Sequence, residues 1–189
     1  MQNRNMKKLL LYLAFLVLAV AACSRDGEKP AVRIPDAFFD LKGYMAGEIE
    51  RLSENQPEVL KRIAIDGRSE EKKFDSLDYR KELDIFSRSD INKTAWLDKY
   101  QIDSTFQDGQ LRQVTYTSKD KSMKTHLLEV GFSGKQVSQI HIQNRTESIV
   151  ADVGQEMWYY PGAGYKLLSR QSTALTQEKE VMVEVEFTK

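Results

Sequence analysis

The sequence predicts an α+β fold, in which two N-terminal helices pack on a curled antiparallel β meander of roughly six to nine strands. Three observations support this class. Apolar residues recur at helical spacing in two segments of the first half of the chain. From Tyr100 onward apolar and polar residues alternate, which is typical of antiparallel strands that are buried on one face. Asp-Gly and Ser-Gly pairs separate the alternating segments, and such pairs favour tight hairpin turns.

The first helix is expected to begin after Pro35-Asp36, with Asp36 as its N-cap, and to end at Asn55-Gln56-Pro57. Gly43 and Gly47 each cost roughly 1 kcal/mol of helix propensity against Ala. We therefore expect them to allow a close approach of this helix to a sheet. The apolar stripe of the helix comprises Phe38, Leu41, Met45, Ile49 and Leu52.

A hairpin is expected over Val59–Phe74, turning at Asp66-Gly67, with a polar second arm that suits the edge of a sheet. Asp75 or Ser76 is then the expected N-cap of a second helix that runs through Ser87. Its inward side chains are predicted to be Leu77, Tyr79, Leu83 and Phe86. The irregular segment Ser89–Tyr100 is expected to cover the core with Trp96.

We expect the rest of the chain to form strands. In the last of them, Val181, Val183 and Val185 alternate with residues that include Glu184 and Glu186. The expected strands are Tyr100–Phe106, Gln110–Ser118, Met123–Phe132, Gln136–Asn144, Tyr165–Ser172 and Glu180–Thr188, with shorter ones at Ile149–Asp152 and Met157–Tyr160.

The first 23 residues predict an export signal. Arg4, Lys7 and Lys8 precede an uncharged apolar run, Leu9–Ala22. As a helix this run spans roughly 21 Å, which is short of the ~30 Å hydrocarbon core of a bilayer. A basic start followed by a short apolar region is typical of a signal peptide. A plain secretory peptide, cut after Ala22 to leave an ordinary N-terminus, is the simpler interpretation.

Val20-Ala21-Ala22-Cys23 resembles the bacterial lipobox, and Cys23 is the only cysteine of the chain. The resemblance implies cleavage between Ala22 and Cys23, attachment of diacylglycerol, with acyl chains such as palmitate, to the Cys23 thiol, and, from Ser24, delivery to the outer membrane. Several acyl chains together anchor a protein stably in a membrane. The expected organisation is a signal peptide at 1–22, a lipidated flexible tether at 23–33 and one α+β domain at 34–189.

Charge and composition exclude some partners. Removing the leader's three basic residues from the 28 of the chain leaves 25 against 28 acidic ones, a net charge of −3 for the mature chain. No basic stripe with interleaved aromatic residues stands out, so nucleic acid is not an expected partner. With Cys23 acylated no thiol remains for a disulfide.

His126 and His141 are the only histidines, and they could form half of a metal site if the strand register placed them side by side. A two-residue turn at Ser133-Gly134 would place them directly opposite each other. A three-residue loop, Phe132-Ser133-Gly134, instead gathers the apolar residues on one face, and register follows the buried face. We therefore expect His126 on the apolar side, His141 on the other, and no metal pair. The apolar residues concerned are Leu128, Val130, Ile140 and Ile142.

Other candidate motifs carry little chemistry. Ser69-x-x-Lys72 and Ser118-x-x-Lys121 match a Ser–Lys pattern, but both lie in polar segments rather than at the start of a buried helix. Glu180, Glu184 and Glu186 line one strand face and are expected to form cross-strand charge pairs with Lys166 and Arg170. No cofactor or catalytic motif is found, which favours a protein that is not an enzyme.

The densest aromatic group is Met157–Pro161. Core packing is the usual role of such a group. If exposed, Trp158, Tyr159 and Tyr160 are the candidate contacts for a ligand or partner.

Three segments, FFDLKGYMAGEIERL (38–52), ELDIFSRSDINKTAW (82–96) and WYYP (158–161), resemble those of a family of uncharacterised Bacteroidota lipoproteins. The resemblance implies a lipid-anchored envelope protein and adds no active site. We expect a non-enzymatic periplasmic-facing module that binds an apolar ligand or an envelope partner. The alternative is an envelope hydrolase whose site forms from residues far apart in the sequence. A pocket between the sheet and the helix at 34–54 would favour the binding module. A Ser or Asp side chain within hydrogen-bond reach of His126 or His141 would favour the hydrolase.

Overall fold

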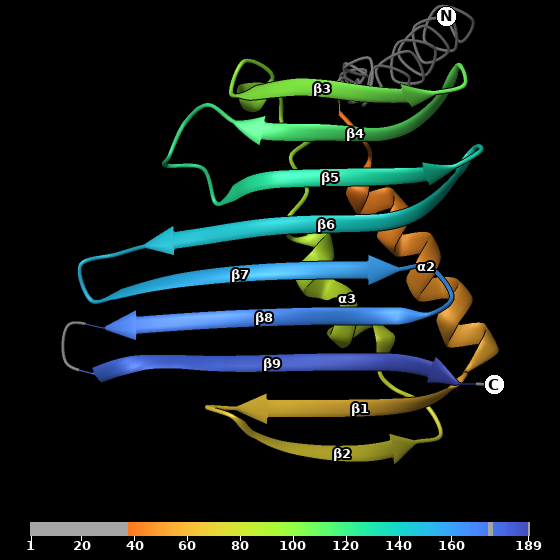
Figure 1. Ribbon diagram of the computed structural model, residues 1–189, viewed down its shortest axis with the longest axis vertical. Helices are drawn as coiled ribbons and strands as arrows, with labels where there is room; N and C mark the ends of the chain where they lie inside the picture. The colour runs from red at the N-terminus through yellow and green to blue at the C-terminus, as the bar shows by residue number, and fades with distance from the viewer. Residues whose placement is uncertain (1–37, 174–175, 189) are drawn as a thin grey trace, which may run out of the picture. The chain divides into compact units, whose positions relative to one another are not determined.

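The computed structural model describes residues 38–173 and 176–188 (Figure 1). The predicted signal peptide at 1–22, the cleavage site between Ala22 and Cys23, and the tether at 23–33 lie outside the described residues. So does Asp36, the predicted N-cap of the first helix. Within the described part of the chain, no helix has both the length and the apolar composition needed to cross a membrane.

The described residues form one open, nine-stranded antiparallel sheet and two α-helices, so the α+β class is confirmed. The strand order is β2-β1-β9-β8-β7-β6-β5-β4-β3, and the sheet does not close. The strands are β1 (Glu58–Ile65), β2 (Arg68–Phe74), β3 (Tyr100–Gln107), β4 (Gln110–Ser118), β5 (Thr125–Ser133), β6 (Gln136–Glu147), β7 (Ala151–Tyr160), β8 (Gly164–Thr173) and β9 (Thr176–Thr188). The two short strands predicted at Ile149–Asp152 and Met157–Tyr160 are instead one continuous strand, β7.

The two helices do not both precede the sheet. Helix α2 (Leu41–Asn55) comes first, the β1–β2 hairpin follows, and helix α3 (Tyr79–Ser87) and a short 3₁₀ turn (Thr94–Trp96) come next. The hairpin turns at Asp66-Gly67 as predicted, where both residues have positive φ, and β2 is an outer strand of the sheet. Strand β1 pairs with β9, so the first and the last of these strands are hydrogen-bonded neighbours.

The N-caps lie later than predicted. The Asp40 side chain accepts from the Gly43 N–H at 2.8 Å and caps α2, and the Asp78 side chain accepts from Lys81 N–H at 3.2 Å and caps α3. A cap needs a side-chain oxygen within reach of the free N–H groups of the first turn. Asp78 meets that condition in α3, and Asp75 and Ser76 lie too early for it. The predicted end of α2 is confirmed at Asn55.

The two helix glycines do not bring α2 close to the sheet. A Cβ atom at Gly43 would lie 2.1 Å from Asp40 Oδ2, so Gly43 leaves room for the capping carboxylate. A Cβ atom at Gly47 would meet nothing within 4 Å among the described residues. The prediction of a close helix–sheet contact at these positions is therefore wrong.

Both helices lie on one face of the sheet, which we call the covered face (Figure 1). Side chains from α2, α3 and the central strands pack there and are almost completely buried, and Trp96 is half-buried at their margin. The main ones are Leu41, Met45, Leu52, Leu83, Phe86, Leu128, Val130, Ile140, Ile142, Met157 and Tyr159. They fill the layer between the helices and the sheet at positions where the predicted apolar stripes meet.

The β5–β6 register places the apolar residues on one face of the sheet, as predicted, but through a β-bulge and not through the predicted loop. Ser133 pairs with Gln136 and Gly131 pairs with Gln139, so the extra residue is a bulge at Ser138 rather than a three-residue loop. Leu128 faces Ile142 and Val130 faces Ile140 on the covered face. As a result Glu129 lies directly opposite His141 on the other face of the sheet, which we call the open face.

Candidate functional site

A single row of side chains crosses the open face, one from each of the nine strands, and we call it the polar row. Its members are direct cross-strand partners in the ladder of the sheet. In order from β3 to β2 they are Asp103, Thr115, Glu129, His141, Trp158, Lys166, Glu184, Arg62 and Glu71. Acidic and basic side chains alternate along much of this row.

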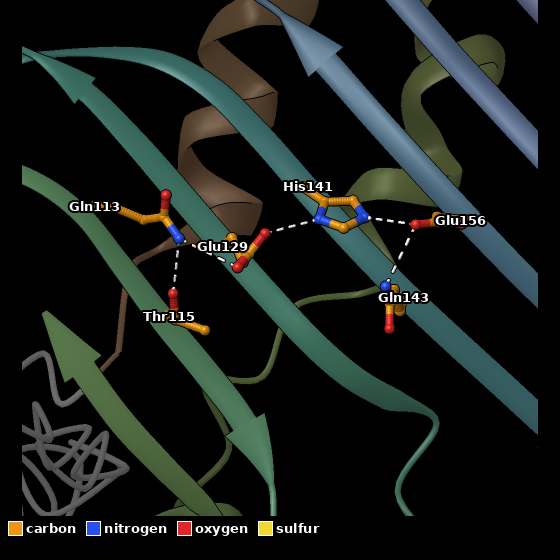
Figure 2. Close-up of polar contacts among 6 residues, drawn as sticks. All are labelled: Gln113, Thr115, Glu129, His141, Gln143 and Glu156. Carbon is orange, nitrogen blue, oxygen red and sulfur yellow. Dashed lines mark hydrogen bonds and ion pairs between the residues drawn. The ribbon is translucent and has the colours of Figure 1, made fainter. Parts of the chain in front are cut away.

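His141 is held between two carboxylates at the centre of the row (Figure 2). Its Nδ1 lies 2.8 Å from Glu129 Oε2 and its Nε2 lies 3.0 Å from Glu156 Oε1. An ionised carboxylate only accepts hydrogen bonds. Both contacts are hydrogen bonds at once when the imidazole carries a proton on each nitrogen.

Further contacts fix the groups around His141. Its ring stacks on Trp158, with ring centroids 5.1 Å apart and planes 4° from parallel. Gln143 Nε2 donates to Glu156 Oε1 at 3.3 Å. Gln113 Nε2 donates to Glu129 Oε1 at 3.1 Å and lies 3.0 Å from Thr115 Oγ1, as Figure 2 shows. The network extends over four neighbouring strands, β4 to β7, and leaves polar atoms facing outward.

The β1–β2 end of the row is an ion-pair ladder. Arg62 donates to Glu184 at 2.9 Å and to Glu71 at 2.6 Å. Lys166 Nζ lies 5.9 Å from the centre of the Trp158 ring. Arg170 pairs with Glu180 at 2.9 Å, which confirms the charge pair predicted between these strands.

A hollow lies beside the polar row, and Gly154 of β7 is one of the residues that line it. A Cβ atom at Gly154 would meet nothing within 4 Å. An interior Gly weakens a strand and often marks a place where another molecule or backbone approaches. Nothing packs on this glycine within the part of the chain that the structure describes. The side chains around the hollow include His126, Gln143, Arg145, Glu156, Leu168 and Arg170.

The charges around the hollow are balanced. Arg145 forms ion pairs with Asp152 and Glu147, both at 2.8 Å. Arg170 on the opposite side pairs with Glu180. These pairs place acidic partners beside both guanidinium groups and leave little net charge at the hollow.

His126 lies at the hollow, not on the apolar side as predicted. A bulge between Thr125 and Leu127 gives the buried position to Thr125, whose side chain is buried next to Asn144. His141 does lie on the open face, as predicted. The register does not pair the two histidines. Among the described residues, no three His, Cys, Asp or Glu side chains are placed to hold a metal ion.

The aromatic group at the end of β7 does not form one surface. Trp158 lies on the open face, whereas Tyr159 is fully buried on the covered face and donates to Glu48 Oε2 at 2.5 Å. Burial and the Glu48 carboxylate both raise the pKa of Tyr159. Tyr160 is 40% exposed at the strand end. Of the three predicted contact residues, Trp158 and Tyr160 keep exposed surface.

The Ser–Lys pairs serve local structure. Ser118 Oγ donates to the Asp120 carbonyl at 2.7 Å and accepts from Asp120 N–H, as in a turn. Ser69 is exposed on the outer strand β2.

Among the residues of the site that sequence reasoning missed are Glu129, Gly154 and Glu156. Gly154 carried a usable signal, because an isolated Gly inside an alternating segment suggests a close approach to the backbone. The two glutamates carried none, because a Glu at an outward strand position is ordinary until the register places it beside a histidine.

The chain matches no protein-family model, no curated protein and no solved structure. The resemblance to Bacteroidota lipoproteins therefore stays a prediction, and function is inferred from the geometry of the open face.

Proposed function

We propose that the protein is a lipid-anchored, non-enzymatic binding module of the bacterial envelope. We further propose that it holds an uncharged, hydroxyl-rich ligand, such as a glycan chain, on its open face. The observation that carries this proposal is the hollow over Gly154, where a strand glycine has no packing partner among the described residues. The anchor at Cys23 and the outer-membrane address come from the lipobox resemblance, and they remain part of the proposal.

An apolar ligand between the helices and the sheet suits the structure less well. That layer is filled by side chains such as Met45, Leu128 and Met157, which are completely buried. A cavity there would require these residues to separate, and close packing of a core makes such separation costly. The hollow over Gly154 on the open face offers room for a ligand without repacking.

The chemistry of the hollow suits hydroxyl groups. A hydroxyl both donates and accepts, so it pairs equally well with the guanidinium of Arg170 and the carboxylate of Glu156. Because the arginines are already neutralised by acidic partners, an anionic ligand would gain little there.

The hydrolase alternative has no specific contact in its favour within the described part of the chain. Both ring nitrogens of His141 contact glutamate carboxylates, neither of them a Ser or Asp side chain. A general base needs a free nitrogen within reach of the proton it removes. His141 is therefore suited to holding Glu129 and Glu156 in place.

The proposal is tested by filling the hollow. Gly154→Phe places a ring where Gly154 leaves open space, and its backbone is not in the left-handed region. Ser69→Phe is the matched control, because Ser69 is exposed on the outer strand β2, four strands away from β7. The full chain would be screened for binding to an array of neutral and acidic glycans.

We expect the wild-type chain and Ser69→Phe to bind the same neutral glycans. Gly154→Phe should bind them on the order of tenfold more weakly, or not at all. Circular dichroism would verify that all three chains are folded. The proposal fails if the wild-type chain binds no glycan, or if Gly154→Phe binds as tightly as Ser69→Phe.

A further inference from the structure

The two edge strands of the sheet, β2 and β3, differ in charge. Strand β2 has the sequence RSEEKKF, in which five of seven residues are charged, whereas β3 has the sequence YQIDSTFQ, with Asp103 as its one charged residue. Charged side chains, Lys above all, protect an outer strand from pairing with another chain. β3 has only Asp103 as such protection along its eight residues and no Lys, and Ile102 and Phe106 are 48% and 66% exposed.

The hydrogen bonds between β3 and β4 show which backbone groups of β3 point away from the sheet. Lys119 N–H donates to the Lys99 carbonyl at 2.8 Å, next to the pair Tyr100–Ser118. In an antiparallel ladder, alternate residues bond to the same neighbour. The odd-numbered residues of β3 therefore bond to β4, and Ile102 and Ser104 direct their N–H and C=O groups away from the sheet.

We propose that β3 pairs with β3 of a second copy of the chain, in an antiparallel ladder about a two-fold axis at Ser104. The outward groups of even-numbered residues then meet even-numbered residues of the partner. Ser104 faces Ser104 of the partner subunit, and Ile102 faces Phe106 of the partner subunit. The pairing joins two exposed apolar residues on each side of the axis.

The charge on β3 selects this register. An axis at Asp103 would set two carboxylates directly opposite each other, which is unfavourable. An axis at Ile102 would leave Phe106 without a partner residue. With the axis at Ser104, Asp103 faces Thr105 of the partner subunit and Gln101 faces Gln107 of the partner subunit, so no like charges are directly opposed.

The assembly would be one continuous sheet. The two-fold axis between the antiparallel edge strands is perpendicular to the sheet, so both helix layers lie on one side and both open faces lie on the other. Each copy satisfies the outward backbone groups of the other along β3. The dimer does not depend on what the open face binds.

The first test is site-directed cross-linking in the full chain, purified in detergent, with Cys23→Ser so that one introduced thiol remains. Residues directly opposite in a hydrogen-bonded pair have Cα atoms ~5.5 Å apart. Ser104→Cys should therefore give a covalent dimer with a short bis-maleimide. Ser69→Cys, on the charged outer strand β2, is the control. Absence of the Ser104 cross-link, or equal cross-linking at Ser69, overturns the proposal.

The second test measures mass by light scattering. Ser104→Lys sets two ammonium groups opposite each other at the axis, whereas Ser69→Lys changes the β2 edge. Both side chains are exposed, so both variants should fold. We expect the wild type and Ser69→Lys to be dimers. The dissociation constant of the Ser104→Lys dimer should be about tenfold higher or more. A monomeric wild type, or a dimer that tolerates Ser104→Lys, overturns the proposal.

Discussion

Three consecutive residues of β7 show how different the two faces of the sheet are. Met157 and Tyr159 point to the covered face and are fully buried, whereas Trp158 between them points to the open face and stacks on His141. The same alternation continues into β6, where Ile140 and Ile142 are buried and His141 bonds to two carboxylates. One strand thus contributes to the core with every second residue and to the candidate site with the others.

The difference teaches where stability and recognition reside. A fully buried apolar side chain contributes about 1.5–3 kcal/mol by leaving water. An exposed ion pair contributes roughly 0–1 kcal/mol. The covered face therefore determines whether the domain folds, and the open face can vary its polar residues at little cost. Substitutions on the covered face should lower the stability of the domain, whereas substitutions on the open face should alter ligand binding.

The largest expected effect is on the covered face. Met157→Ala removes a buried side chain at the centre of the sheet and leaves a cavity, which we expect to lower the free energy of unfolding by about 2–5 kcal/mol. Urea denaturation at pH 7 measures the change. Glu156→Gln, the neighbouring open-face position, is the control and should cost less than about 1 kcal/mol. Equal losses at both positions would contradict the separation of the faces.

A smaller effect is expected where the covered face includes a charge. Burial alone would raise the pKa of Glu48, but hydrogen bonds from Arg51 and Tyr159 outweigh it and hold the pKa below its usual value of 4.5. The ionised Glu48 therefore adds stability above that value, and this stability is lost as the pH falls through the lower pKa of the folded state. Tyr159→Phe removes one of these bonds.

We expect Tyr159→Phe to lower the free energy of unfolding by about 1–3 kcal/mol at pH 7, with a smaller loss near pH 3. Denaturation at both pH values measures the difference. Tyr100→Phe is the matched control, because the Tyr100 hydroxyl donates to the backbone carbonyl of Thr125 at 2.7 Å. Burial raises the pKa of Tyr100 to about 12, so its loss should be the same at both pH values. A pH-independent loss at Tyr159 would show that Glu48 does not mediate it.

Much of the covered face could be predicted from the sequence because its signals are local. The Asp66-Gly67 and Asp108-Gly109 turns fixed two hairpins, and the alternation in 180–188 fixed which residues of β9 point inward. The N-caps were misplaced because several Asp and Ser residues near each helix start can cap equally well on sequence alone. Asp40 and Asp78 are distinguished by geometry, since their carboxylates reach a free N–H.

The open face could not be predicted, because it depends on pairing between distant segments. The polar row exists only because β1 pairs with β9, which places Arg62 opposite Glu184 across 122 positions of the chain. Loop length sets the register of a hairpin, but nothing local sets the register of such a distant pair. Two bulges, beside Thr125 and at Ser138, further determine where His126 and His141 lie. One extra residue in either strand would move a histidine to the other face.

The smallest effect is expected at the far end of the polar row. Arg62 bonds to Glu71 and Glu184, but its side chain is 37% exposed, so water and salt weaken both pairs. Arg62→Gln should lower the free energy of unfolding at low salt by less than any of the substitutions above. The loss should vanish near 1 M salt, where the screening length is about 3 Å. Paired urea titrations at low and high salt measure this. A loss as large as that of Met157→Ala would mean that the ion-pair ladder, and not the buried face alone, holds β1 and β2 to the sheet.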